Sequence, residues 1–327
     1  MEIGSFIEMQ FARGLEYYQG ESFAGLSIAR LNSGKAGILH AFRLTGCKRL
    51  WLPLYLCDCV RELFRRQQIE LRHYHIDRNF NPLNLKPTDE EAVLLVNYYG
   101  VMSESRMRQL AAPYPNVIID NCQAFFAPPL PHCQNVYSCR KFIGVPDGAY
   151  VIGSNAEKFM TEYEQGYSSD TALFLLLRLE YGCEGKAYAA RMQNERRLEN
   201  EPPKKMSKLT RSILDGSDYP QIIAKRRENF FYAQRLFASL NLLKPLANFD
   251  ETCVPMIYPL LLESDTLLHT LQANKHFQGH WWSYLLHETP PQSAEHWLSK
   301  YIIPISIDQR YGKKELDFLH KLTAQHL

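Results

Sequence analysis

One lysine, Lys141, lies between a short apolar run and a Pro-Asp-Gly turn in the segment 136–150, VYSCRKFIGVPDGAY. An ammonium group loses hydration when protein covers it, so a shielded lysine pairs with an acid, gives up its proton or forms an imine with a carbonyl compound. Ser138 precedes this lysine by three positions, and Gly144 and Gly148 allow close backbone turns after it. We therefore expect a shielded Lys141 that does carbonyl chemistry, with a plain loop lysine beside a turn as the alternative.

A carboxylate upstream, Asp120, favours the first interpretation. It follows the apolar run of the segment 116–123, NVIIDNCQ, which is typical of a buried strand. Ligands collect at the carboxyl ends of strands in an α/β sheet, so a site can form at this position. Pyridoxal phosphate needs a lysine to hold its aldehyde as a Schiff base and a carboxylate to keep its pyridine nitrogen protonated. Lys141 and Asp120 suit these two roles; for Asp120 the alternative is a helix cap or a turn.

The composition is that of an ordinary globular protein and argues against two kinds of partner. Of 327 residues, 46% are hydrophobic and 22% are charged, and the formal net charge is +2. Basic residues form no long block, so we expect no nucleic-acid partner. The longest apolar run, 171–177, is far shorter than the roughly 20 residues of a membrane span, so we expect no membrane partner either.

The N-terminal residues mix acids and an arginine with apolar residues and show no basic start followed by an apolar core. We therefore expect no signal peptide, a cytoplasmic location, and 8 cysteines that are free thiols and mostly buried. Cys57 and Cys59 are close in sequence, but Cys-Asp-Cys lacks the two-residue gap of a redox motif. It also lacks a second cysteine or histidine pair at zinc spacing, so we expect no metal site.

Short apolar runs alternate with amphipathic segments over the first half of the chain. The expected strands there are 50–54, 70–76, 92–96, one around 117, one around 136 and 149–153, and the expected helices are 35–44, capped by Ser33, 58–68 and 104–112. This alternation predicts an α/β fold with a three-layer, mostly parallel sheet.

The second half of the chain reads first as helical and then as α+β. We expect helices at 173–197, 219–240, 265–274 and 313–325, strands at 254–262, 279–286 and 302–307, and a solvated connection at 194–208. We therefore predict a large domain with a helical extension over 1–220 and a smaller C-terminal α+β domain over 221–327.

Four segments occur in an order that resembles the DegT/StrS-type sugar aminotransferases, a branch of the fold-type I pyridoxal-phosphate enzymes. They are 32–39 (NSGKAGIL), 97–100 (NYYG), 120–123 (DNCQ) and 138–148 (SCRKFIGVPDG). The likeness covers roughly residues 30–155 well and the rest by architecture, with 301–307 also similar. It implies a fold-type I pyridoxal-phosphate transferase fold for the large domain.

The resemblance implies a phosphate site at the start of a helix. Ser33, Gly34 and Lys35 match the family's Ser-Gly-Thr segment, which opens a helix whose N-terminal amides hold the cofactor phosphate. A helix N-terminus suits an anion because its first amides are unpaired and the helix dipole is positive there. Lys35 replaces the usual threonine, so a hydroxyl contact is lost and a charge replaces it. The alternative is a plain capped helix.

The resemblance also implies roles for residues on other segments. Asp120 matches the acid that bonds the pyridine nitrogen, and Gln123 matches the residue that touches the ring or its phenolic oxygen. Lys141 matches the lysine that forms the Schiff base, and Ser138 resembles a phosphate-binding serine of fold-type I transaminases. Tyr55, in the loop LPLYLC, matches the aromatic residue that stacks on the cofactor, with a core tyrosine as the alternative.

Two departures from the family pattern affect the substrate more than the cofactor. The family's Asn-Tyr-Arg-Met segment, which reaches the neighbouring subunit's site, has no clear copy, and 206–208 is the nearest place. The chain is also shorter than usual, and its C-terminal substrate loops differ. The resemblance implies a homodimeric aminotransferase that moves an amino group from an amino acid, glutamate, to a keto sugar linked to a nucleotide, with Lys141 as general base.

Two alternatives remain open. One is a dehydratase or lyase that acts on a related substrate, although family members that dehydrate sugars replace the lysine with histidine. The other is a regulatory or structural relative without turnover, which the missing segment and Lys35 would fit. A nucleic-acid-binding module would need a basic stripe that the sequence lacks.

Overall fold

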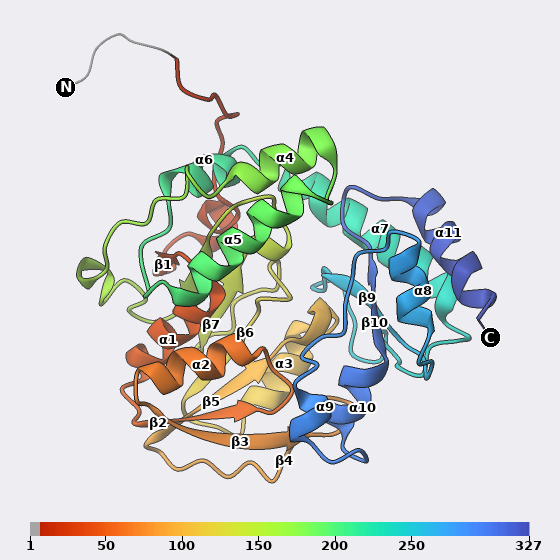
Figure 1. Ribbon diagram of the computed structural model, residues 1–327. Helices are drawn as coiled ribbons and strands as arrows, with labels where there is room; N and C mark the ends of the chain where they lie inside the picture. Colours follow the sequence, from red (N-terminus) through yellow and green to blue (C-terminus); the bar gives the residue numbers. More distant parts are fainter. Residues whose placement is uncertain (1–6, 327) are drawn as a thin grey trace.

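The computed structural model describes residues 7–326 and contains one large sheet (Figure 1). Its strands are β1 Ile28–Leu31, β2 Arg49–Pro53, β3 Glu70–Ile76, β4 Pro82–Leu83, β5 Glu91–Val96, β6 Val117–Asp120, β7 Gln134–Ser138 and β8 Ala149–Ile152. Their order across the sheet is β1-β8-β7-β6-β5-β2-β3-β4. Strands β7, β6, β5, β2 and β3 are parallel, β8 is antiparallel to β7 and β1, and β4 is antiparallel to β3.

Helices cover both faces of this sheet. The first three are α1 Gly34–Thr45, α2 Asp58–Arg66 and α3 Glu104–Ala111. Helix α2 connects β2 to β3, α3 connects β5 to β6, and the two connections run in opposite directions along the sheet. Right-handed crossovers in opposite directions place their helices on opposite faces. The sheet is therefore the middle of three layers, which confirms the predicted α/β fold.

The central strands show why the sequence predicted this sheet. All residues of β5 (EAVLLV) and β6 (VIID) are buried. Parallel strands with helices on both faces have no solvent side, so their sequences read as continuous apolar runs rather than as alternating patterns. The edge strands β1 and β4 are short and have no continuous apolar run, so the sequence pattern predicted neither of them.

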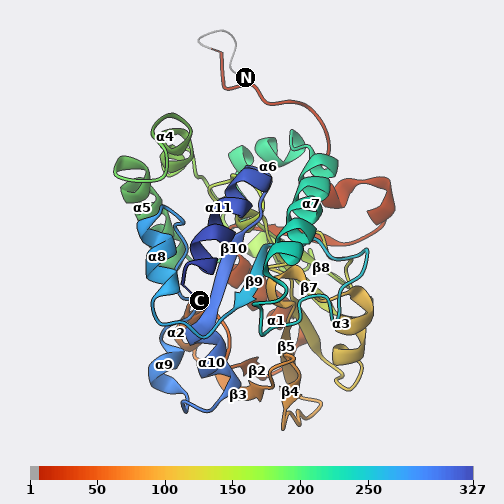
Figure 2. The same cartoon turned by 90° about the vertical axis from the view of Figure 1, so that its right-hand side faces the viewer.

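A second, two-stranded antiparallel sheet lies beside the large one (Figure 2). It consists of β9 Ile257–Leu261 and β10 Ile302–Ser306, and the helices of this part are α7 Tyr219–Phe237, α8 Leu267–Ala273, α9 Leu285–Glu288, α10 Ala294–Tyr301 and α11 Lys313–Ala324. Helix α10 joins this part to the large sheet, because the Glu295 carboxylate accepts a hydrogen bond from the Ile76 amide of β3 at 2.7 Å. The predicted α+β character is present; a domain boundary at 220/221 stays a prediction.

The predicted strand at 279–286 is wrong. Its first part is a loop in which Trp282 has a φ of 57°, a left-handed conformation that a strand cannot contain. Its last residues begin α9. Aromatic residues favour strands on average, but here the tryptophans pack on tyrosines of the loops after β2 and β5. The Trp282 ring lies edge-on to Tyr55, with the ring centroids 4.5 Å apart, and Trp281 packs on Tyr99.

The predicted helix at 173–197 is two helices, α4 Leu173–Tyr181 and α5 Lys186–Asn200. Between them Gly182 and Gly185 have φ values of 81° and 55°, which glycine adopts without the strain of a side chain. The solvated connection predicted at 194–208 is also wrong. Asn194 is fully buried and donates to the Pro146 carbonyl at 2.9 Å, and α6 Lys208–Asp215 follows directly.

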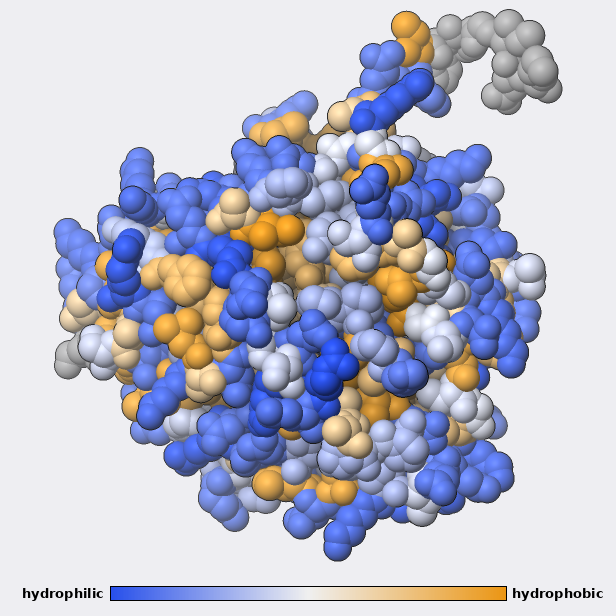
Figure 3. All heavy atoms as spheres, turned by 180° about the vertical axis from the view of Figure 1, so that it is seen from behind, coloured by the Kyte–Doolittle hydropathy of each residue, from blue (hydrophilic) through white to orange (hydrophobic). Residues whose placement is uncertain are grey.

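The surface of the protein is mixed on the side opposite to that of Figure 1. Figure 3 shows hydrophobic residues there in separate small groups between hydrophilic ones, which is the ordinary surface of a globular protein. Within residues 7–326, every helix is too short or too polar to cross a membrane.

Candidate functional site

The candidate site lies at one edge of the large sheet. Strands β1, β2, β5, β6 and β7 all point the same way, so their carboxyl ends meet there. The connections turn in opposite directions on leaving β2 and β5, and such a switch point is where open α/β sheets bind ligands. The predicted site residues all follow or end these strands: Ser33, Gly34 and Lys35 after β1, Tyr55 after β2, Asp120 and Gln123 at and after β6, and Ser138 and Lys141 at and after β7.

Asp120 is the last residue of β6 and is only 5% exposed. Its Oδ1 accepts a hydrogen bond from the Cys122 amide at 2.9 Å, and its carbonyl accepts one from the Asn97 amide at 3.0 Å. These bonds fix the carboxylate at the sheet edge. A covered carboxylate is costly without a positive partner, so this position favours a cationic or protonated group of a ligand.

Lys141 is exposed, so the expectation of a shielded lysine is wrong. It ends the short 3-10 helix η4 Cys139–Lys141, where the chain has just left β7. Because β7 is the parallel neighbour of β6, the lysine and Asp120 lie at the same edge. The pKa of the Cys57 thiol, in the loop after β2, is lowered mainly by the hydrogen bond that it shares with Cys59 and further by the Cys59 amide and the charge of Lys141.

The N-terminus of α1 also lies at this edge. Ser33 caps the helix as predicted, because its Oγ accepts a hydrogen bond from the Ala36 amide at 3.4 Å. As first residues of the helix, Gly34 and Lys35 have amides without an intrahelical acceptor, so they can bind an anion. The Lys35 ammonium points elsewhere: Nζ donates to the Glu199 carbonyl of α5 at 2.7 Å, and burial lowers its pKa.

Gly34 lies where three of these segments meet. A Cβ at this position would lie 2.7 Å from the Cys122 Sγ and 3.7 Å from the Ser138 Cβ. The first distance is shorter than side chains tolerate, so the close approach of Cys122 requires a glycine. The structure therefore brings the start of α1, the end of β7 and the segment after Asp120 together.

Gln123 supports a strained turn in the neighbouring loop. Its side chain is 3% exposed, and its Oε1 accepts a hydrogen bond from the Tyr99 amide at 2.9 Å. Tyr99 has a φ of 60°, which is unusual for a residue with a bulky side chain. The carboxamide oxygen of Gln123 thus holds the Asn-Tyr-Tyr-Gly loop after β5 in place. Its predicted contact with a cofactor ring stays a prediction.

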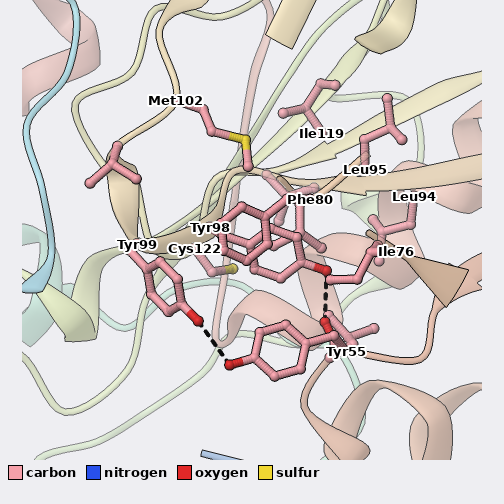
Figure 4. Close-up of a cluster of buried hydrophobic side chains, with 14 of the residues drawn as sticks. Tyr55, Ile76, Phe80, Leu94, Leu95, Tyr98, Tyr99, Met102, Ile119 and Cys122 are labelled. Carbon is pink, nitrogen blue, oxygen red and sulfur yellow. Dashed lines mark hydrogen bonds between the residues drawn. The ribbon is translucent and has the colours of Figure 1, made fainter. Parts of the chain in front are cut away.

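Tyr55 belongs to a buried aromatic cluster beside the switch point (Figure 4). Its hydroxyl shares a hydrogen bond with the Tyr99 hydroxyl at 2.8 Å, and the Tyr98 hydroxyl donates to the Tyr55 carbonyl at 2.8 Å. Burial raises the pKa of Tyr55. With an exposed fraction of 0%, its ring presents no free face to a small molecule in this conformation. The structure shows a core position, and stacking on a cofactor stays a prediction.

Asp147 holds the Lys141 segment in place, although the sequence predicted only a turn here. Its carboxylate is 1% exposed and accepts hydrogen bonds from the Ser207 amide at 3.0 Å and the Ser207 hydroxyl at 2.7 Å. The hydroxyls of Thr210 and Ser168 donate to the same carboxylate. The segment 206–208, which had no assigned role, therefore fixes the turn after Lys141 to the start of α6.

The two cysteines after β2 form a second feature that the sequence did not predict. Cys57 and Cys59 are partly exposed, and their sulfur atoms lie 2.8 Å apart. The only signal in the sequence was their spacing: Cys57 is the extended N-cap residue of α2, and a side chain at that position can reach back over the first residues of the helix, where Cys59 is second. Their neighbours include Lys141 and Lys35, whose charges act on the Cys59 thiol.

The edge thus combines three chemical capacities. A helix N-terminus can hold an anion, a covered carboxylate can pair with a protonated ring nitrogen, and an exposed primary amine can react with a carbonyl group. Two cavities, of about 480 Å³ and 530 Å³, lie away from these residues. The first cavity is lined by Trp297 among others, and the second by Tyr163 among others. None of the predicted site residues lines either cavity.

Comparisons with known proteins relate this geometry to a known fold. No family model matches the sequence, and no curated protein matches it significantly. Among solved structures, the sugar aminotransferase CalS13 from Micromonospora echinospora matches with a TM-score of 0.65 and 12% identity. The match covers 92% of this chain and 87% of that chain. The chain has the fold of the sugar aminotransferases.

Two further structures share this aminotransferase fold. A DegT DnrJ EryC1 StrS aminotransferase from Brucella abortus has a TM-score of 0.62 at 12% identity, with 93% of this chain and 87% of that chain covered. The E. coli GDP-4-keto-6-deoxy-D-mannose-3-dehydratase has a TM-score of 0.62 at 15% identity, with 94% and 90% covered. These neighbours support the resemblance that the four sequence segments indicated.

Proposed function

We propose that the protein is a pyridoxal-phosphate-dependent aminotransferase that moves an amino group from an amino acid to a keto sugar. One observation carries the proposal: the buried carboxylate of Asp120 and the exposed amine of Lys141 follow neighbouring parallel strands at one sheet edge. The fold shared with sugar aminotransferases supports the reaction class. Glutamate as donor and a nucleotide-linked sugar as acceptor are the finer part of the proposal.

The residues of the edge fit this cofactor. The amides of Gly34 and Lys35 at the start of α1, with the Ser138 side chain close by, would bind the phosphate. Asp120 would pair with the protonated pyridine nitrogen, and Gln123 would lie along the ring. When bound, pyridoxal phosphate supplies an aldehyde for covalent attachment and a ring that accepts electrons. Lys141 would carry the cofactor through its Nζ.

Lys141 has a second role in this proposal. Once the amino donor has replaced it, its Nζ would take the proton from the donor's α carbon as a general base. The side chain is suited to this movement because it is exposed and ends a short helix rather than lying packed in the core. Asp147 and its partners on α6 would hold the backbone still while the side chain moves.

A dehydratase is the second candidate, because one structural neighbour is a keto-sugar dehydratase. Both candidates use the same cofactor chemistry and differ in what leaves the sugar. The presence of Lys141 favours amino transfer. A relative of the fold without turnover is the third candidate, and in that case the edge would bind the cofactor or a related anion without consuming an amino donor.

The proposal keeps three expectations that rest on the sequence alone. The protein would act as a homodimer, it would work in the cytoplasm, and the chain would divide near residue 220 into a large and a small domain.

The deciding experiment follows 2-oxoglutarate formation from glutamate by the purified protein with added pyridoxal phosphate. We expect formation by the parent protein and a rate about 10²-fold lower for Asp120→Asn, which removes the charge and keeps the shape. Asp170→Asn, an exposed acid far along the chain, is the matched control and should act like the parent. Cofactor binding without any oxo acid from a panel of amino donors would reject amino transfer, and water loss from a keto sugar would then identify the dehydratase.

A further inference from the structure

Cys57 and Cys59 are arranged as a dithiol at the start of α2. Cys57 immediately precedes the helix, Cys59 is its second residue, and the two Sγ atoms are 2.8 Å apart. A disulfide bond is about 2.05 Å long, so the two sulfurs lie close to bonding distance. Within residues 7–326, no other pair of cysteines is in hydrogen-bond contact through its sulfurs.

The two thiols differ in character. The pKa of Cys57 is lowered, mainly by the hydrogen bond that it shares with the Cys59 thiol, and also by the Cys59 amide and the charge of Lys141. Burial and the neighbouring Asp58 carboxylate oppose this shift. The pKa of Cys59 is raised, because its proton is held in the bond to Cys57 and because the thiol is partly covered. Cys57 also stands directly before α2, where the positive end of the helix stabilises a thiolate, so Cys57 is suited to be the nucleophile and Cys59 the proton-bearing partner.

Access favours this pair over most other cysteines of the protein. Cys122, Cys133, Cys139 and Cys253 are buried, whereas Cys57 and Cys59 are partly exposed. Cys47 and Cys183 are also partly exposed, but neither has a second sulfur as a partner in the described part of the chain. These two residues are natural controls for exposure without pairing.

We propose that Cys57 and Cys59 are a reversible modification site, at which hydrogen peroxide oxidises the two thiols to an intramolecular disulfide. The Cys57 thiolate attacks one peroxide oxygen, the O–O bond breaks, and the leaving hydroxide takes up a proton to become water. The sulfur of Cys59 then attacks the Cys57 sulfenic acid, the S–O bond breaks, and the departing hydroxide leaves as a second water with the Cys59 proton. Two thiols lose two electrons, and one peroxide becomes two waters.

The location gives the modification a consequence for the candidate site. Cys57 follows β2, whose carboxyl end lies at the same sheet edge as the ends of β1 and β7. The dithiol is therefore at the edge that carries the helix N-terminus and Lys141, and the charges of Lys141 and Lys35 act on it. Oxidation replaces the two thiols on which the Lys141 charge acts by a disulfide, which carries no proton. The disulfide itself does not depend on the proposed activity, and its formation can be measured on protein without cofactor or substrate.

The test uses the full chain, treated with one equivalent of hydrogen peroxide and then with N-ethylmaleimide under denaturing conditions. We expect six maleimide adducts by intact mass where the untreated protein, with its 8 cysteines, has one on each, together with a cross-linked Cys57–Cys59 peptide and full reversal by dithiothreitol. We also expect native Cys57 to react with the maleimide at least about tenfold faster than Cys183. Cys57→Ser and Cys59→Ser should each abolish the disulfide, while Cys47→Ser and Cys183→Ser should leave it unchanged.

The single variants separate the two steps. In Cys59→Ser, Cys57 should accumulate as a sulfenic acid that dimedone labels; in Cys57→Ser, Cys59 should remain a thiol. The proposal is overturned if both residues are still alkylated after oxidation, or if Cys57 gains oxygen in the parent protein without a cross-linked peptide. Because the labelling rates and the cross-link are measured on the parent protein, poor folding of a variant would not decide the outcome.

Discussion

The Gln123 carboxamide oxygen holds the backbone of Tyr99, whose amide donates to it over 2.9 Å. Tyr99 has a φ of 60°, and its hydroxyl meets that of Tyr55, so this one bond connects the segment after β6 to the aromatic cluster at the switch point. The side chain that the sequence assigns to a cofactor also supports the loop after β5.

Replacing Gln123 by methionine keeps the volume and removes the acceptor. The Tyr99 amide would be left buried and unpaired, so we predict that Gln123→Met lowers the free energy of unfolding by about 2 kcal/mol. Urea denaturation measures this, with the exposed Gln221→Met as control. A loss below about 0.5 kcal/mol would show that the bond does not hold the turn.

Gly34 and Cys122 give a prediction about packing at the phosphate end. A Cβ on Gly34 would lie 2.7 Å from the Cys122 sulfur, so Gly34→Ala should cost about 1–3 kcal/mol of stability. Cys122→Ala removes the obstructing atom. The double variant should therefore be at least about 1 kcal/mol more stable than the sum of the single effects predicts. Additive effects would contradict the close approach.

Asp147 gives a prediction about the segment that carries Lys141. Asp147→Ala leaves the Ser207 amide and the hydroxyls of Ser207 and Thr210 without their acceptor, and we predict a loss of about 3 kcal/mol. Asp170→Ala, an exposed acid, should change stability by less than about 0.5 kcal/mol. Equal small losses for both variants would mean that the turn does not depend on this carboxylate.

Local sequence patterns determine part of this structure, and packing determines the rest. The Val-Ile-Ile run before Asp120 predicted a buried strand, and Ser33 predicted a helix cap; both are local signals and both are confirmed. The order of strands with helices between them predicted the parallel sheet and therefore the edge where the candidate residues gather. The roles of these residues toward a cofactor stay predictions.

The errors have physical causes as well. The aromatic residues at 279–286 read as a strand, but Trp282 packs on Tyr55, and no local pattern reveals a partner so far along the chain. Lys141 has apolar neighbours in sequence, and its exposure follows from its place at the sheet edge. The break between α4 and α5 had a local signal in Gly182 and Gly185, which the analysis of helical spacing passed over.

His276 gives a prediction about pH. It is 8% exposed, and burial lowers its pKa from 6.5 to about 4. Between these two pKa values the unfolded chain binds a proton on His276 and the folded protein does not. The contribution of His276 to the free energy of unfolding is therefore fully present above pH 6.5 and is lost as the pH falls toward 4. The loss between pH 7 and pH 5 should be about 2 kcal/mol. Protonation is unfavourable because the Nε2 accepts from the Ser306 amide and the buried Nδ1 has no partner among the described residues.

The measurement is urea denaturation at several pH values for the parent, His276→Leu and the exposed His287→Leu. We predict a flatter profile between pH 5 and pH 7 for His276→Leu alone. A profile parallel to that of the parent protein would assign the pH dependence to other groups.

The most direct test of the proposed function is the place of cofactor attachment. The protein would be incubated with pyridoxal phosphate, reduced with borohydride and mapped by peptide mass spectrometry, beside Lys141→Arg and Lys35→Arg. We predict attachment at Lys141 in the parent and in Lys35→Arg, and none in Lys141→Arg. Attachment at Lys35 or at another lysine, or no attachment at all, would contradict the assignment of Lys141 and with it the proposed aminotransferase.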